Sequence, residues 1–308
     1  MKKLVLLSLI PMVLCGCGRK DKYKDLRFVV PTGAPAIAMA AFADLDGFDT
    51  VTDPSTIVPI MTAEQVDVAV LPTNVGVTAI NVKKVPYKLL CTITFGNLYI
   101  ASTGKDEDGV MGADDYIVSF QQGAVPDKIF HYVYGTELDS ALHYVSGAAD
   151  AAKCLKTGKN LADDSKDVDY VFLAEPALTK VLETTANASV YANLQELYKV
   201  KSEGLMLTQA SVFVRSALEE NVVKKAIYKT IEQSVNQMIK KSENISTYMN
   251  KIDEPATIFG VEAEYAVKTM GAGNKMGLGC KLASDIKDDI NKFLAIFGVS
   301  PIIDENIA

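Results

Sequence analysis

Short apolar runs that alternate with helical stretches are the feature of this sequence that most constrains its fold. The run Val66–Leu71 is typical of a parallel strand that is buried on both faces. It follows, in order, a strand at Leu26–Val30, a helix at Ala36–Ala43, a strand at Thr50–Thr52, and a helix that begins at Asp53-Pro54 and ends near Glu64. This order of strand, helix, strand, helix, strand predicts an open α/β sheet.

A second α/β series begins after two strands predicted at Tyr87–Thr94 and Asn97–Ser102. Its strands and helices alternate at Tyr116–Phe120, Pro126–Tyr134, Ala141–Val145, Ala148–Leu155, Asp169–Leu173 and Ala177–Leu182. A β-rich run follows at Leu205–Ser216, and everything after Leu218 is predicted to be helical with short breaks. We therefore predict a first lobe of residues 26–100 and 205–308 and a second lobe of residues 101–204. Crossing strands at Leu98–Ser102 and Lys199–Leu207 would join them.

The N-terminus has the pattern of a bacterial export signal. Lys2 and Lys3 precede an apolar run, Leu4–Leu14, that is shorter than the roughly 20 residues of a membrane-spanning helix. The tetrapeptide Leu14-Cys15-Gly16-Cys17 resembles a lipobox, in which a small residue precedes the cysteine that is lipidated. We predict a signal peptide at residues 1–16, lipidation of Cys17 and a polar tether at residues 17–25. The alternative is an ordinary cleaved signal with incidental cysteines.

Charge and residue types exclude several classes of function. The chain has a net charge of -7, and loss of Lys2 and Lys3 with the signal peptide makes it -9. An acidic chain is not attracted to nucleic-acid phosphates, so nucleic acid is not a predicted partner. His131 and His143 lie in separate elements away from other metal ligands, and no nucleophile elbow or phosphate-binding loop is present. The sequence thus predicts no metal, no cofactor and no catalytic residues.

The order of the loops resembles that of a known family of binding proteins. Five segments carry the likeness: Pro31-Thr32-Gly33-Ala34-Pro35-Ala36, Asp67-Val68-Ala69-Val70-Leu71-Pro72-Thr73-Asn74, Gly96-Asn97-Leu98-Tyr99, Gly123-Ala124-Val125-Pro126-Asp127 and Ala174-Glu175-Pro176. On these segments the chain resembles the nitrate/sulfonate/taurine-type solute-binding proteins of ABC importers. The resemblance implies a two-lobe type II periplasmic binding protein fold of the α/β class, with a ligand cleft between the lobes that closes about a hinge.

The resemblance also implies partners and a location. A lipoprotein of this family captures a small organic solute, of the sulfonate, nitrate-like or pyrimidine vitamin-precursor class, for an ABC permease with its ATPase. The lipid on Cys17 would hold the chain on the outer face of the bacterial cell membrane. Two alternatives stay open. One is a small-molecule enzyme on the same fold, and the other is a surface lipoprotein that binds a protein through an exposed apolar patch.

Candidate ligand contacts lie in the loops after the strands, because open α/β sheets bind ligands at the carboxyl ends of their strands. In chain order they are Thr32, Gly33, Ala34, Pro35, Thr73, Asn74, Phe95, Asn97, Gln121, Gln122, Gly123, Ser146, Glu175 and Gln209. Structural alternatives are a plain turn for Thr32–Pro35, helix capping for Thr73, Asn74 and Glu175, and core packing for Phe95.

The charges in these loops bear on the solute. The only arginines are Arg19, Arg27 and Arg215, so none of the candidate loops contains a guanidinium that could clamp an anion. An anionic solute would need backbone amides and helix N-termini instead. The carboxylate of Glu175 would suit a cationic or amine-bearing solute.

Overall fold

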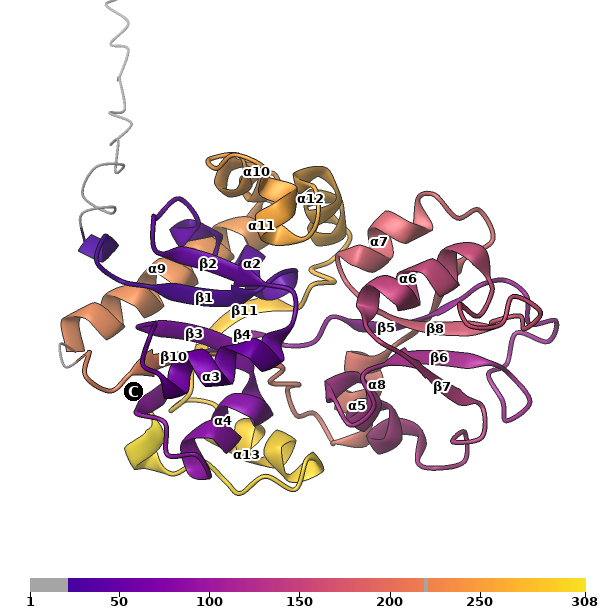
Figure 1. Cartoon of the computed structure of the whole chain (residues 1–308), viewed down its shortest axis with the longest axis horizontal. Helices are drawn as coiled ribbons and strands as arrows, with labels where there is room; N and C mark the ends of the chain where they lie inside the picture. Colours follow the sequence, from indigo (N-terminus) through magenta and orange to yellow (C-terminus); the bar gives the residue numbers. More distant parts are fainter. Residues whose placement is uncertain (1–21, 219–220) are drawn as a thin grey trace, which may run out of the picture.

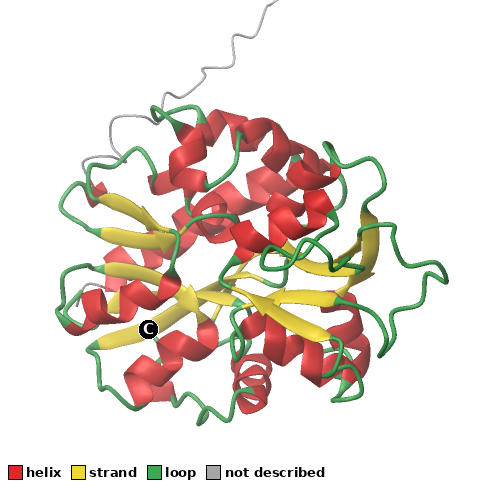
Figure 2. Cartoon of the chain, turned by 45° about the vertical axis from the view of Figure 1, so that its right-hand side comes forward, coloured by secondary structure: helices red, strands yellow, loops and turns green. Residues whose placement is uncertain are grey.

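The computed structural model describes residues 22–218 and 221–308, which form two β-sheets with helices on their faces (Figures 1 and 2). The predicted signal peptide, the lipidation site Cys17 and residues 17–21 of the predicted tether lie outside these residues. Within the described part of the chain, no helix is long and apolar enough to cross a membrane.

The first sheet has six strands in the order β11-β4-β10-β3-β1-β2 and defines the first lobe. Side chains of β3 alternate between two cores, with Val68 and Val70 on one face and Ala69 and Leu71 on the other. Burial on both faces explains why this strand is an apolar run. The strands are β1 (Phe28–Pro31), β2 (Phe48–Val51), β3 (Val68–Pro72), β4 (Tyr87–Thr94), β10 (Ala210–Arg215) and β11 (Leu278–Leu282).

Helices cover both faces of this sheet (Figure 2). They are α2 (Ala34–Ala38), α3 (Ile57–Thr62), α4 (Thr73–Asn81), α9 (Asn221–Lys240), α10 (Asn244–Met249), α11 (Pro255–Phe259), α12 (Ala263–Gly271) and α13 (Lys287–Ile296), with short 3-10 turns η1 (Ala40–Phe42), η2 (Pro54–Thr56) and η3 (Asp304–Asn306). The single helix predicted at Ala36–Ala43 is therefore two pieces, α2 and η1, which meet at Met39.

The second sheet has five strands in the order β7-β6-β8-β5-β9 and defines the second lobe. One apolar core of its own surrounds it. The strands are β5 (Leu98–Ser102), β6 (Ile117–Phe120), β7 (Leu142–Val145), β8 (Tyr170–Ala174) and β9 (Ser189–Asn193), and the helices are α5 (Val125–Tyr134), α6 (Ala148–Thr157), α7 (Ala177–Leu182) and α8 (Leu194–Lys201).

Two edge strands depart from the sequence prediction. The region after Leu218 is not helical throughout, because β11 pairs antiparallel with β4. The strand β9 and the helix α8 are not predicted either, since residues 189–191 of β9 are exposed and lack an apolar alternation. Each of these strands has one neighbour in its sheet, so backbone hydrogen bonds hold it with little side-chain burial.

The chain passes between the sheets at two crossings. The first is Phe95–Asn97, between β4 and β5, and the second is residues 202–209, between α8 and β10. The predicted crossing at Leu98–Ser102 is wrong, because β5 pairs with β8 along its whole length. The predicted crossing at Lys199–Leu207 overlaps the second one but begins inside α8.

The directions of the strands bring loops of both lobes together. In the first sheet β1, β3 and β4 run the same way, because β10 is antiparallel to both β3 and β4. Since β4 ends at the first crossing, all three strands end on that side of the sheet. In the second sheet β5 begins at that crossing and β8 is antiparallel to it, so β8 ends on that side. Its parallel neighbour β6, and β7 beside β6, end on the same side. We call this region, where strands of both sheets end, the junction.

Candidate functional site

Three predicted contact residues are bonded to one another at the crossings. Gln209 donates from Nε2 to Oδ1 of Asn97 (2.9 Å), and its Oε1 accepts from the Asn97 N–H (3.2 Å). Asn97 Nδ2 donates to the Glu175 carbonyl oxygen (2.8 Å), and the Glu175 N–H donates to the Asn97 carbonyl oxygen (2.8 Å). These bonds tie both crossings to the end of β8. We call Asn97, Glu175 and Gln209 the hinge cluster.

Glu175 is only 2% exposed, and its carboxylate is bonded to the helix that follows it, α7. Its Oε2 accepts from the Thr179 N–H (2.9 Å), and its Oε1 accepts from the Thr179 hydroxyl (2.9 Å). Burial raises the pKa of this carboxyl, against the bonds from Thr179 and the positive charge of Lys275, which lower it. Both oxygens thus bond to Thr179 in the first turn of α7, as the capping alternative expects, and a contact of Glu175 with ligand stays a prediction.

The loop after β1 is held by its own backbone amides. The Thr32 N–H donates to the carbonyl of Val51 (2.9 Å), and the Gly33 N–H donates to the carbonyl of Phe259 (2.9 Å). Ala34 and Pro35 form the first turn of α2, with Ala34 buried and Pro35 half-buried. The loop therefore lies against β2 and α11, and its amides at Thr32 and Gly33 are bonded within the protein.

Thr73 and Asn74 begin α4 in different surroundings. Thr73 is fully buried, and its hydroxyl lies 2.8 Å from that of Ser211, which in turn lies 2.9 Å from that of Thr92. The adjacent Asn74 is half-buried, and its Oδ1 is buried with no hydrogen-bond partner. Thr73 is therefore part of the interior, whereas Asn74 carries an unused acceptor at the junction.

The loop between β6 and α5 is held by Asp127, which is not among the predicted ligand contacts. Gln121, Gln122 and Gly123 are exposed. Asp127, 4% exposed, accepts from the Gly123 N–H (2.7 Å) and from the Tyr144 hydroxyl (2.5 Å). The sequence could have indicated this role of Asp127, because an acid in the first turn of a helix often binds nearby backbone N–H groups. The remaining predicted contact of this lobe, Ser146, is exposed after β7.

Buried polar atoms without partners gather at the junction. In residues 22–218 and 221–308 these side-chain atoms are Asn74 Oδ1, Thr94 Oγ1, Ser119 Oγ, Gln195 Nε2, Thr208 Oγ1 and Arg215 Nε. All but the last belong to residues at or near the strand ends of the junction or on a crossing. Such atoms are costly unless water or a ligand binds them. The junction thus contains donors and acceptors that water or a ligand can bind.

One cavity, of 420 Å³, lies at the junction between the edge strands β9 and β11. Phe95, on the first crossing, lines it and packs its ring over Gly279 of β11. Tyr99 and Gln195 add polar groups, and burial raises the pKa of Tyr99 to about 12. None of its lining residues belongs to the loops that follow β1, β3 and β6.

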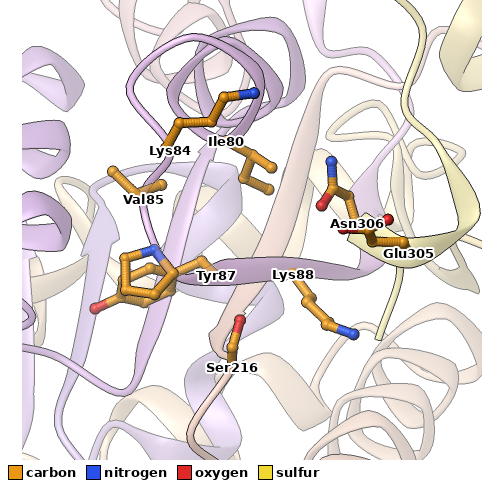
Figure 3. A pocket seen from close by; sticks show the side chains of 9 residues that line it. Ile80, Lys84, Val85, Tyr87, Lys88, Ser216, Glu305 and Asn306 are labelled. Carbon is orange, nitrogen blue, oxygen red and sulfur yellow. The ribbon is translucent and has the colours of Figure 1, made fainter.

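A second cavity, of 310 Å³, lies at the other end of the first sheet, by the start of β4. Figure 3 shows the side chains that line it, among them Lys84, Tyr87, Lys88, Ser216 and Glu305. None of these belongs to a loop at the junction. The unpartnered polar atoms at the junction belong to hydroxyl and amide groups, whereas Glu196 and Lys275 add charge to the lining of the 420 Å³ cavity. In the described residues, no cluster of three or more acids, histidines or cysteines could hold a metal ion.

Comparison with known proteins supports this geometry at the level of the fold. No family model and no curated protein matches the chain. Among solved structures, an ABC transporter protein from Parabacteroides distasonis is similar, with a TM-score of 0.70 and 18% identity over 89% of this chain and 92% of that one. The periplasmic aliphatic sulphonate binding protein of Escherichia coli has a TM-score of 0.62 and 11% identity, over 92% and 91%.

A third structure names the fold. The Candida albicans CA3427 gene product, described as having the generic periplasmic binding protein structural fold, has a TM-score of 0.53 and 12% identity over 91% of this chain and 92% of that one. The two-sheet α/β arrangement of this chain matches that fold, so the predicted fold class is confirmed.

Proposed function

We propose that this chain, which has the periplasmic binding protein fold, is the extracytoplasmic solute-binding lipoprotein of an ABC importer. Its lobes would close about the hinge cluster around a small organic solute. The group of unpartnered polar atoms at the junction carries the proposal. A solute that supplied the missing hydrogen bonds from both lobes would bind the closed form more tightly than the open one. The closed form would then dock on the permease.

The proposed solute is a sulfonate, a nitrate-like ion or a pyrimidine-type vitamin precursor, and the similar sulphonate-binding protein favours the first. Neither Arg27 nor Arg215 is placed to bind it, since Arg27 precedes β1 and Arg215 ends the antiparallel strand β10, both at the end of the first sheet away from the junction. There the Arg215 guanidinium binds Asp67. An anionic solute would be bound by amides and hydroxyls, a mode that favours shape and hydrogen-bond pattern over charge.

Native mass spectrometry of the protein purified from its host tests the proposal, because a captured solute would add a defined mass. Calorimetric titration with taurine, nitrate and a hydroxymethylpyrimidine covers the three solute classes. Binding of one of them, with the solute recovered unaltered, is the expected result. Failure of all three to bind, with no co-purified molecule, would refute the proposal, and a chemically changed solute would favour the enzyme alternative.

Asn74→Ala is expected to weaken binding of the solute by about five- to a hundredfold, as removal of one buried hydrogen-bond partner does. Its Oδ1 is buried and unpartnered, so the same substitution should leave the stability of the ligand-free protein unchanged or slightly raised. Gln122→Ala probes the second lobe in the same way. Calorimetry and thermal melts measure both quantities. The control is Asn236→Ala, an exposed position on α9. Equal affinities for all three variants and the parent would show that neither Asn74 nor Gln122 contacts the solute.

Cys17→Ala is expected to release the protein from the membrane fraction, because Gly16-Cys17 follows an export signal of the length typical of lipoproteins. Cell fractionation and labelling with a palmitate analogue check it, with Cys154→Ala as the matched control. A variant that stays membrane-bound and labelled would show that Cys17 is not the anchor.

A further inference from the structure

Charged side chains join the two lobes along one edge of the junction. Lys180 of α7, in the second lobe, donates to both carboxylate oxygens of Glu262 at the start of α12, in the first lobe (2.9 and 2.8 Å). The same ammonium lies 5.6 Å from the ring of Tyr265. Further along both helices, Lys268 of α12 pairs with Glu183 at the end of α7. Figure 1 shows the two helices facing one another at this edge.

The opposite edge is joined by apolar contacts instead. Phe293 of α13 is fully buried within the core of the second lobe, whereas its neighbours Ile290 and Leu294 belong to a core of the first lobe. Asp289 of the same helix accepts from the Met206 N–H on the second crossing (2.9 Å). Separation at this edge would expose Phe293, which is costly in water. Opening at the edge of α7 and α12 would instead leave Phe293 buried.

From this asymmetry we propose that Lys180–Glu262 and Glu183–Lys268 form a salt-sensitive latch, which holds the lobes closed at the α7–α12 edge and lets ionic strength set the closed population. In its bearing on solute capture, the latch rests on the proposed function. All four side chains are partly exposed, between 30% and 63%. Exposed ion pairs are weakened by salt, since the screening length falls from about 10 Å at 0.1 M to about 3 Å at 1 M.

The latch is tested with the double variant Glu262→Gln with Lys268→Gln, which breaks both pairs and leaves the net charge unchanged. Measured values for exposed pairs imply a fall of about 2- to 30-fold in the ratio of closed to open molecules. Spin labels on non-canonical residues at Asn236 of α9 and Lys156 of α6, both exposed, report the lobe separation in the full-length, ligand-free protein. The matched control is Glu264→Gln with Lys241→Gln, which alters two exposed charges of the first lobe.

The parent protein should show a growing long-distance population from about 0.02 M to about 1 M NaCl, the double variant should show it already at low salt, and the control should behave like the parent. A variant of the parent with the first pair swapped, Lys180→Glu with Glu262→Lys, should keep most of the parent's closed population, because ions of opposite charge still face each other. If the distances between the two labels changed neither with salt nor in the double variant, the latch proposal would be wrong. Because no solute is present, a salt-responsive distance in a protein that binds none of the tested solutes would leave the latch standing and refute the proposed function.

Discussion

Asp67→Ala is expected to lower the free energy of unfolding by about 3 kcal/mol, the lower end of the cost of removing one partner of a buried ion pair, because the Arg215 guanidinium left behind keeps some contact with water. Asp67 is 4% exposed; its Oδ1 lies 2.5 Å from Nη2 of Arg215, and its Oδ2 accepts from the Arg27 N–H (2.9 Å). The substitution leaves the Arg215 guanidinium, 29% exposed, without a counter-charge, and its Nε already has no partner. It also removes a link between β1, β3 and β10.

Urea denaturation followed by circular dichroism measures this loss. Asp67→Asn should fall between the parent and Asp67→Ala, because an amide oxygen still accepts from the Arg27 N–H. The control is Lys153→Met, which breaks the exposed pair Lys153–Asp150 and should cost less than about 1 kcal/mol. If Asp67→Ala cost no more than this control, the ion pair would not hold the strands of the first sheet together.

Gly277→Ala should destabilise the protein by about 3 kcal/mol or more, the sum of a left-handed backbone and a steric clash. Gly277 has φ +59°, and a Cβ at this position would lie 2.0 Å from the carbonyl oxygen of Gly96 on the first crossing. The Gly277 carbonyl also accepts from the Phe95 N–H (2.7 Å). An added methyl group must therefore push β11 away from the crossing.

Gly298→Ala is the matched control, because Gly298 has a similar φ of +65° but open space around its Cβ position. It should cost only the backbone part, about 1 to 2 kcal/mol. Thermal and urea unfolding of the two variants then separate the clash from the strain. Equal losses would mean that the loop before β11 is free to move away from the crossing, and that it does not help to position the hinge.

Much of the fold follows from local patterns. The run Val66–Leu71 predicts a buried strand from its own residues, and in the structure each side chain from Val68 to Leu71 faces one of two cores. The loops at the carboxyl ends follow from the order of strands and helices, since parallel strands end on the same side. By contrast, β9 and β11 depend on a neighbouring strand for their hydrogen bonds and have no such pattern.

The role of each polar residue at the junction depends on partners that are far away in the sequence. Asn97, Glu175 and Gln209 have the types and positions of ligand contacts, yet Asn97 finds its partners 78 and 112 residues away, at Glu175 and Gln209. Thr73 and Asn74 are adjacent and alike in polarity, but only Thr73 meets Ser211, which lies 138 residues further along the chain. A hydroxyl or an amide suits either use equally well, so its residue type does not decide between them.

The sequence by itself determined the α/β class, the buried strands and the loops that reach the junction, because these depend on hydrophobic periodicity and turn residues within short windows. Only the tertiary structure decided which junction residues form the hinge cluster, which keep an unpartnered atom, and which charges meet between α7 and α12. Those outcomes depend on the distance between side chains that are remote in the chain. Whether a polar group is satisfied is a property of its surroundings in the folded protein.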